Sequence, residues 1–244
     1  MTTSTADLWH HYGRARATSD RTVPDTFYWS WSQDAGPGPE VLGDLTCRCV
    51  GDLGAGAARH AAHLAIHHQP ARVVAVDASL AQHAMATDLY AHLAPRLRIV
   101  QSGGASPAGD DRHVRRAVSV FGAVDFTDPR ELLPAAAAAL KPGGRLVFAT
   151  LAHYLNGAPA QPGPVAADIP AKTPDGETTT MRRWGSAEHV WTKLLDEAGY
   201  QHHHGRAACR HLRAAYRRHP ADERVPPVLE QGPAPPATCG SRAR

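Results

Sequence analysis

The chain has 244 residues, of which 43% are hydrophobic and 20% charged, with a formal net charge of +3. This composition predicts one globular domain of ordinary size and excludes a disordered chain. Its basic residues are mostly scattered among acidic ones, which argues against a nucleic-acid-binding protein. The sequence shows neither the apolar core of a signal peptide nor a run of about 18 apolar residues, so we expect a cytoplasmic protein that does not bind a membrane.

Metal binding is not expected from the cysteines and histidines. The cysteines form no C-x-x-C pair and should be reduced thiols; they are Cys47, Cys49, Cys209 and Cys239. His60, His63 and His67 fall on one face of an expected helix at spacings found in metal sites, but no acidic or cysteine partner accompanies them in sequence. The run His202–His204 could bind nickel adventitiously.

The N-terminal part combines a helix and a cluster of aromatic residues. Residues 6–18 predict a helix with Leu8, Trp9 and Tyr12 on one side. Much of the aromatic content of the chain follows at 27–32, before a Gly/Pro-rich stretch. We assign residues 1–43 to a separate N-terminal segment.

The stretch 48–77 predicts a strand, a tight turn, a helix and a second strand. The turn is Gly54-Ala55-Gly56, and the second strand, Val73–Val76, ends on Asp77. Glycines let the backbone approach a ligand closely, and N–H groups at the start of the helix can face it. Asp77, at the carboxyl end of its strand, is placed to accept hydrogen bonds from ribose hydroxyls. The unit therefore predicts a nucleoside-cofactor site.

The residues around the turn discriminate between cofactors. A dinucleotide fingerprint, G-x-G-x-x-G/A, requires a small residue where Arg59 stands. Asp52 precedes Gly54 by two residues, which gives an acid followed by G-x-G. The pattern therefore disfavours a dinucleotide oxidoreductase.

Further helices and strands alternate up to residue 150, which predicts a doubly wound, Rossmann-like, mostly parallel α/β sheet with helices on both faces. Ser79 and Asp128 are expected N-caps, and Pro129 fits the first turn of the second helix. The expected elements are a helix from Ser79 to Leu93, strands at 97–100 and 117–121, and a helix from Asp128 to Leu140.

Leu140-Lys141-Pro142-Gly143-Gly144-Arg145-Leu146-Val147 follows, a glycine turn into a buried strand. Together with Asp52–Gly56 and Asp77, it resembles, in order and spacing, the class I S-adenosylmethionine-dependent methyltransferases. The resemblance covers residues 45–150 and is strongest to the ubiquinone-biosynthesis-like group and to small-molecule methyltransferases of bacterial natural-product pathways. Ala58 departs from the pattern, since the family frequently has a third glycine there.

The resemblance implies S-adenosylmethionine as cofactor and S-adenosylhomocysteine as product. Asp77 would bind the ribose, with Ala78 beside it, and Asp52 would brace the loop. Gly54 and Gly56 would line the methionine and ribose path. Phe121 and Gly122 would also sit beside the cofactor. The family often carries an acid after the third strand to bind adenine, but this chain has Gln101-Ser102, which leaves Ser102, backbone groups or Asp110 for that task.

The candidate catalytic residues are Asp125 and His153, which follow the fourth and fifth strands, where ligands bind in open α/β sheets. Methyl transfer is an in-line displacement, so a general base is needed only for a weak nucleophile such as a hydroxyl. Alternatively, Asp125 caps the helix that follows, and His153 bonds a loop.

The resemblance also implies a substrate pocket built by the N-terminal segment and by an insertion at 151–185. Tyr28, Trp29 and Trp31 would belong to a lid over the mouth of the site; alternatively, the tryptophans plug the edge of the sheet. The insertion would contribute Tyr154, Arg183 and Trp184.

The C-terminal end is the main departure from the family, which normally finishes with two more strands. We divide the chain into 1–43, a core of 44–200, and an atypical, partly disordered segment, 201–244. Residues 201–244 show no clear strand alternation; 207–218 looks weakly helical and basic, and six prolines follow. The basic residues of 207–218 are expected to form a solvent-exposed face of this helix.

The predicted function is methyl transfer to an O, N or C nucleophile of a small metabolite, with no nucleic acid or membrane partner, in a monomer or homodimer. The alternative is a non-catalytic, methyltransferase-like binding or accessory protein. It is motivated by Ala58, by the missing acid after the third strand and by the unusual C-terminus.

Overall fold

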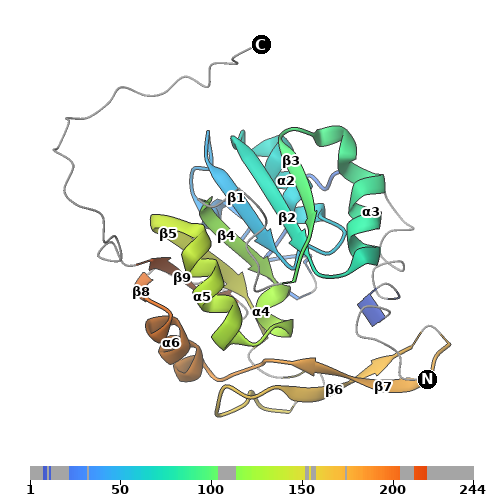
Figure 1. The fold of residues 1–244 in the computed structure, drawn as a ribbon, viewed down its shortest axis with the longest axis vertical. Helices are drawn as coiled ribbons and strands as arrows, with labels where there is room; N and C mark the ends of the chain where they lie inside the picture. The colour runs from blue at the N-terminus through green and yellow to red at the C-terminus, as the bar shows by residue number, and fades with distance from the viewer. Residues whose placement is uncertain are drawn as a thin grey trace.

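The computed structural model describes residues 8–9, 11, 22–31, 33–103, 114–151, 154, 158–173, 175–203 and 212–218. A seven-stranded sheet in the order β3-β2-β1-β4-β5-β9-β8 forms its centre (Figure 1). The elements are η1 (Pro39–Leu42), β1 (Cys49–Leu53), α2 (Arg59–His67), β2 (Arg72–Asp77), α3 (Leu80–Tyr90), η2 (Ala91–Leu93), β3 (Leu97–Gln101), β4 (Val114–Val120), α4 (Ala123–Phe126), α5 (Pro129–Ala139), β5 (Leu140–Ala149), β6 (Ala167–Lys172), β7 (Thr178–Arg183), α6 (Glu188–Glu197), β8 (Tyr200–His203) and β9 (Leu212–Arg218). This confirms the expected doubly wound, mostly parallel α/β fold.

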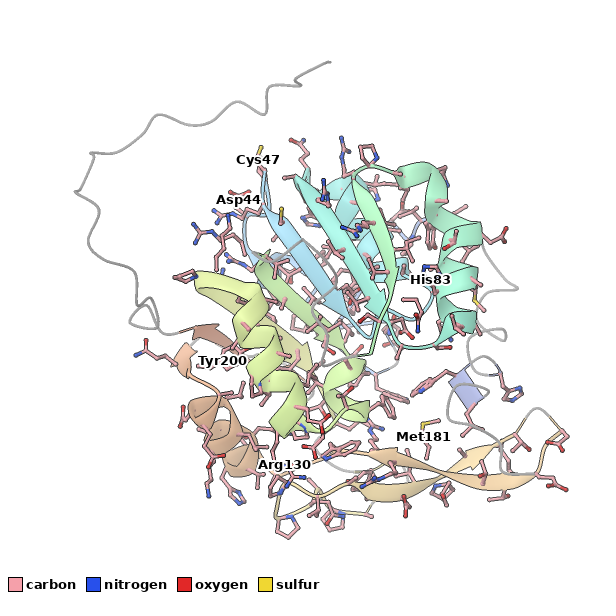
Figure 2. The ribbon with its side chains drawn as sticks, in the orientation of Figure 1. Asp44, Cys47, His83, Arg130, Met181 and Tyr200 are labelled. Atoms are coloured by element: carbon pink, nitrogen blue, oxygen red, sulfur yellow. The ribbon has the colours of Figure 1, made fainter. Side chains whose placement is uncertain are left out.

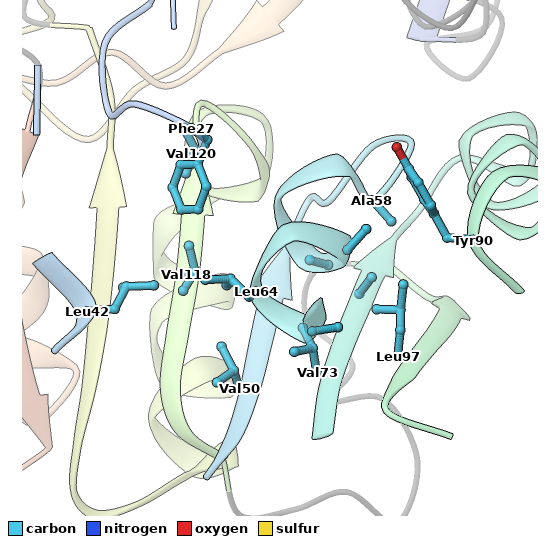
Figure 3. Packing of buried hydrophobic residues seen from close by; sticks show 14 of the residues in the cluster. Phe27, Leu42, Val50, Ala58, Leu64, Val73, Tyr90, Leu97, Val118 and Val120 are labelled. Carbon is cyan, nitrogen blue, oxygen red and sulfur yellow. The ribbon is translucent and has the colours of Figure 1, made fainter. Parts of the chain in front are cut away.

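Strands β1 to β5 are parallel, and most of their apolar residues are buried, as expected for a parallel sheet covered by helices. One core cluster joins Val50, Val73 and Val118 to Leu64 of α2 (Figure 3). A second cluster joins the sheet to α5 and α6. The helix caps expected at Ser79 and Asp128 are confirmed, since their side chains accept hydrogen bonds from the Gln82 and Arg130 amides.

The C-terminal strands overturn one expectation. The segment 207–218 was expected to be weakly helical, but its described residues, 212–218, form strand β9, which is antiparallel to both β5 and β8 and inserted between them. The sequence of β9 does not alternate regularly, because Ala214, Ala215 and Tyr216 are consecutive apolar residues. Backbone pairing with β5 and β8 overrides the weak helical preference, so the sheet is completed by two further strands rather than left open.

The insertion expected at 151–185 contains a hairpin of its own. β6 and β7 form a separate two-stranded antiparallel sheet, which Figure 1 shows below the carboxyl ends of the parallel strands. Ala171 and Met181 of this hairpin pack with Leu8 of the N-terminal segment, and Met181 lies between the hairpin and the main domain (Figure 2). No helix in the described part of the chain is long and apolar enough to cross a membrane.

Candidate functional site

The turns after β1 and β4 meet backbone to backbone. Gly54 has φ +72°, and a Cβ there would lie 2.1 Å from the Ala123 nitrogen. A Cβ on Gly122 would lie 2.6 Å from the carbonyl oxygens of Leu53 and Gly54. The Ser119 hydroxyl links the two turns, because it donates to the Leu53 carbonyl and accepts from the Val124 amide. This contact explains why a side chain is excluded at both glycines.

The glycine contact carries a stability prediction. Gly54→Ala should lower the free energy of unfolding by about 2–3 kcal/mol, because it adds left-handed strain to a steric overlap. Chemical denaturation of Gly54→Ala beside Gly163→Ala measures this, since a Cβ on Gly163 meets nothing within 4 Å and that residue does not adopt a positive φ. Equal losses for the two variants would contradict the prediction.

Asp77 ties the glycine turn to the next helix. Its carboxylate accepts hydrogen bonds from the Gly56 amide at 2.8 Å and from the Ser79 amide at 2.9 Å. Burial raises the pKa of Asp77, while these two amides lower it. Each carboxylate oxygen has a second lone pair, so the group can still accept hydrogen bonds from a ligand. Its position is the one predicted for ribose binding.

Asp52 is 1% exposed and lies close to the same turn. Burial and then the nearby Asp77 charge raise its pKa to about 7, and a hydrogen bond from the Ala61 backbone opposes the rise. Ala61 belongs to the first turn of α2, so Asp52 contacts the start of that helix. Its Oδ2 has no hydrogen-bond partner among the described residues.

A buried ion pair connects the hairpin to the carboxyl end of the sheet. The Arg183 guanidinium donates to the Asp125 carboxylate, and the two side chains are 2% and 0% exposed. Burial raises the pKa of Asp125, whereas the Arg183 charge and the Thr150 hydroxyl lower it. A backbone hydrogen bond connects the same two segments, since the Trp184 amide donates to the Asp125 carbonyl at 2.7 Å.

Aromatic rings surround this ion pair. The Arg183 guanidinium lies 5.4 Å from the ring centre of Trp31 and 5.6 Å from that of Phe126. Trp31 also meets Phe121 edge-on, with ring centres 5.1 Å apart. Phe121 has φ +49°, a left-handed conformation uncommon for a non-glycine residue. The structure therefore brings together four predicted site residues, namely Trp31, Phe121, Asp125 and Arg183.

The other predicted pocket residues lie in the core or contact the segments that flank the site. Trp29 is fully buried in the main core and donates its ring N–H to the Gly38 carbonyl; its assignment to the substrate pocket stays a prediction. Tyr28 is partly buried. The Tyr154 hydroxyl accepts from the Gly185 amide at 3.3 Å and braces the segment after β7. Trp184 is 8% exposed beneath Arg182, whose guanidinium lies 5.3 Å from its ring centre.

The remaining predictions lie at the edge of the site or outside the described residues. The Ser102 amide donates to the Asp77 carbonyl at 2.9 Å, and the Ala78 carbonyl accepts from the Gln101 side chain. Both backbones therefore adjoin the predicted ribose position. His153 and Asp110 lie outside the described residues.

Three supporting residues were missed from sequence. Ser119 and Thr150 are fully buried polar residues, and Gln82 is 5% exposed. The Gln82 side chain donates to the Trp9 carbonyl, and its Oε1 would lie 3.8 Å from a Cβ on Gly56. A hydroxyl inside the apolar run at 117–121 was the one sequence signal available, at Ser119.

Part of the chain matches a known family model, and its fold recurs in solved structures. Residues 50–144 match the family model described as methyltransferase domain. The solved complex of DhpI with SAH aligns with a TM-score of 0.59 at 22% identity, over 89% of this chain and 100% of that one. The [4+2]-cyclase SpnF aligns with a TM-score of 0.57 at 14% identity, over 84% of this chain and 76% of that one. A chain from the complex between the Haloferax volcanii Trm112 methyltransferase activator and a methyltransferase aligns with a TM-score of 0.54 at 18% identity, over 84% of this chain and 80% of that one.

No curated protein sequence matches the chain significantly. At the identities of the solved neighbours, the likeness shows the fold. The match to the methyltransferase domain model covers residues 50–144, and the solved neighbours, several of them titled as methyltransferases, share the fold. The solved neighbours include a complex with SAH, that of DhpI.

Proposed function

We propose that this protein transfers a methyl group from S-adenosylmethionine to a nucleophilic O, N or C atom of a small, partly aromatic metabolite. The observation that carries the proposal is the Asp77 carboxylate, which is held by the Gly56 amide at the carboxyl ends of β1 and β2. In this proposal the partly buried Asp77 carboxylate accepts hydrogen bonds from ribose hydroxyls, beside a turn whose two glycines let a ligand approach the backbone.

The residues present fit such a cofactor. Asp77 would hold the ribose, and the Gly54–Gly56 turn would leave room for the methionine part. S-adenosylmethionine would supply a methyl group bound to a positively charged sulfur. The attacking atom would bond to the methyl carbon as the carbon–sulfur bond broke, and the electron pair would stay on sulfur. The contribution of the protein is then mainly proximity and orientation.

The substrate side of the site is proposed to lie where the N-terminal segment and the β6–β7 hairpin meet. Trp31 and Phe121 would contribute aromatic walls, and the Asp125–Arg183 ion pair would hold the hairpin in place. Aromatic walls favour a flat, partly apolar metabolite, such as those modified in bacterial secondary metabolism. In this proposal Asp125 orients the hairpin, and a proton acceptor, where the nucleophile needs one, comes from elsewhere, with His153 as the candidate.

A second candidate is a methyltransferase-like binding protein without turnover. The observation that favours it is the full burial of Asp125 in an ion pair, which ties up a candidate base. The solved neighbour SpnF bears the name of a cyclase, which illustrates that this fold alone does not determine the reaction.

Calorimetric titration with S-adenosylhomocysteine, with NAD and NADP as controls, tests cofactor choice. We expect micromolar affinity for S-adenosylhomocysteine, about −8 kcal/mol, and none for the dinucleotides. Asp77→Ala should weaken this binding about 100-fold or more, because it removes charge-assisted hydrogen bonds to the ribose.

Asp168→Ala is the matched control, since Asp168 is exposed on β6. Unchanged affinity in Asp77→Ala would contradict the site, and binding to none of the three ligands would contradict the proposed function. Tight binding combined with no methyl transfer across a broad panel of metabolites would favour the binding-protein candidate.

A further inference from the structure

We propose that His63 and His68 form a two-ligand site for a divalent transition-metal ion of the Zn²⁺, Ni²⁺ or Cu²⁺ type, at the carboxyl end of α2. The sequence alone predicts no metal here, because no acidic or cysteine residue accompanies the histidines. The structure supplies a second imidazole from the residue that follows α2. The site is separate from the cofactor site and does not depend on the proposed function.

The distance between the two Nε2 atoms matches the separation of two ligand atoms bound to one metal ion. The Nε2 atoms of His63 and His68 lie 3.3 Å apart. Two nitrogens that each bind Zn²⁺ at about 2.0–2.1 Å in tetrahedral geometry are separated by about 3.3 Å. A metal ion can therefore replace the present contact between the two nitrogens with small side-chain movement.

The tautomer of the His63 ring also suits a residue that binds a metal ion through Nε2. Its Nδ1 lies 2.8 Å from the Pro24 carbonyl oxygen, which can only accept a hydrogen bond. Nδ1 must therefore carry the proton, so in the neutral ring Nε2 presents its lone pair toward His68. Metal-binding histidines commonly donate the other ring N–H to a backbone carbonyl, which fixes the ring in this way. On metal binding, the proton now on His68 Nε2 would move to Nδ1 of that ring, so the ring stays neutral.

Both rings lie where burial disfavours their charged form. Burial lowers the pKa of His63, with His67 and His68 adding to the effect, while the Pro24 carbonyl and the Asp25 charge oppose it. Burial and then His67 lower the pKa of His68. His67 stands four residues after His63, the spacing that puts two histidines on one helical face, and the two ring centres are 4.7 Å apart.

The chemistry of the donors selects the class of ion. Imidazole nitrogens without carboxylates suit Zn²⁺, Cu²⁺ and Ni²⁺ rather than Ca²⁺ or Mg²⁺. No group of three or more histidine, cysteine or acidic side chains converges among the described residues, so water would complete the coordination. Because Pro24 belongs to the same segment as Trp31, a bound ion would also reinforce the contact between α2 and the N-terminal segment.

Calorimetric titration with ZnCl₂ and NiCl₂, after removal of any affinity tag, tests the site. We expect one equivalent to bind, and His68→Gln to weaken binding at least about tenfold. His68→Gln leaves the bond between His63 and Pro24 intact, so it is less disruptive than a change at buried His63. In the Cu²⁺-loaded protein, the electron paramagnetic resonance spectrum should show coupling to two imidazole nitrogens, reduced to one in His68→Gln.

Two control variants locate the binding. His83→Gln, on α3 (Figure 2), should bind metal like the wild type. The triple variant His202→Gln/His203→Gln/His204→Gln should also retain the site. Loss of binding in the triple variant with retention in His68→Gln would overturn the proposal, as would the absence of binding in the wild type.

Discussion

Arg183→Ala is expected to lower the free energy of unfolding by about 3–5 kcal/mol, because it leaves the Asp125 carboxylate buried without a counter-charge. The loss includes the contacts of the guanidinium with Trp31 and Phe126. Urea denaturation followed by tryptophan fluorescence measures this change. Arg130→Ala is the control, since Arg130 is 61% exposed and its pair with Asp128 lies at the surface, so a much smaller change is expected.

A double variant separates the ion pair from general disruption. Asp125→Leu with Arg183→Met replaces both charges by apolar groups, which removes the burial penalty along with the attraction. We expect the double variant to be more stable than either single variant, giving a strongly non-additive cycle. Additive losses would show that the two side chains do not act as a pair.

The same variants separate the roles of hairpin and cofactor site. If the ion pair positions the β6–β7 hairpin, the double variant should retain its affinity for S-adenosylhomocysteine, while the KM for the substrate rises. A parallel loss of affinity for S-adenosylhomocysteine would instead place Arg183 in the cofactor site.

The features that sequence predicted well are local ones. Ser79 and Asp128 accept hydrogen bonds from backbone amides two or three residues further on, so spacing along the chain contains the needed information. The glycine turn is likewise recognisable, although the reason for Gly54, the close approach of Ala123, emerges only when β1 and β4 pair.

The features that sequence missed depend on distant partners. β9 becomes a strand because β5 and β8 supply its hydrogen bonds, and β5 lies more than 60 residues earlier in the chain. Asp125 and Arg183 are 58 residues apart, so their pairing could not be derived from either local pattern. Trp29 and Trp31 are two residues apart, yet one fills the core and the other meets Phe121 and Arg183.

Asp52 should make the stability of the protein depend on pH between about 4 and 7. Its pKa rises from 3.8 to about 7 in the folded state. In this interval the folded protein keeps a proton that the unfolded chain has released, so the free energy of unfolding falls as pH rises. The contribution levels off above the folded pKa, at about 4 kcal/mol of lost stability. Burial also raises the pKa of Asp77, which adds to the trend in the same direction.

Asp52→Asn isolates this contribution, because asparagine resembles the protonated acid in shape and cannot ionise. The stability advantage of the variant over the wild type should grow by about 2–3 kcal/mol between pH 5 and pH 8. Urea denaturation at both pH values measures it, with Asp196→Asn on the exposed side of α6 as the control that should show no such growth. A pH-independent difference between Asp52→Asn and the wild type would mean that Asp52 is ionised in the folded protein throughout this range. In that case the carboxylate must have a counter-charge or a hydrogen-bond donor at Oδ2, where the described residues supply neither.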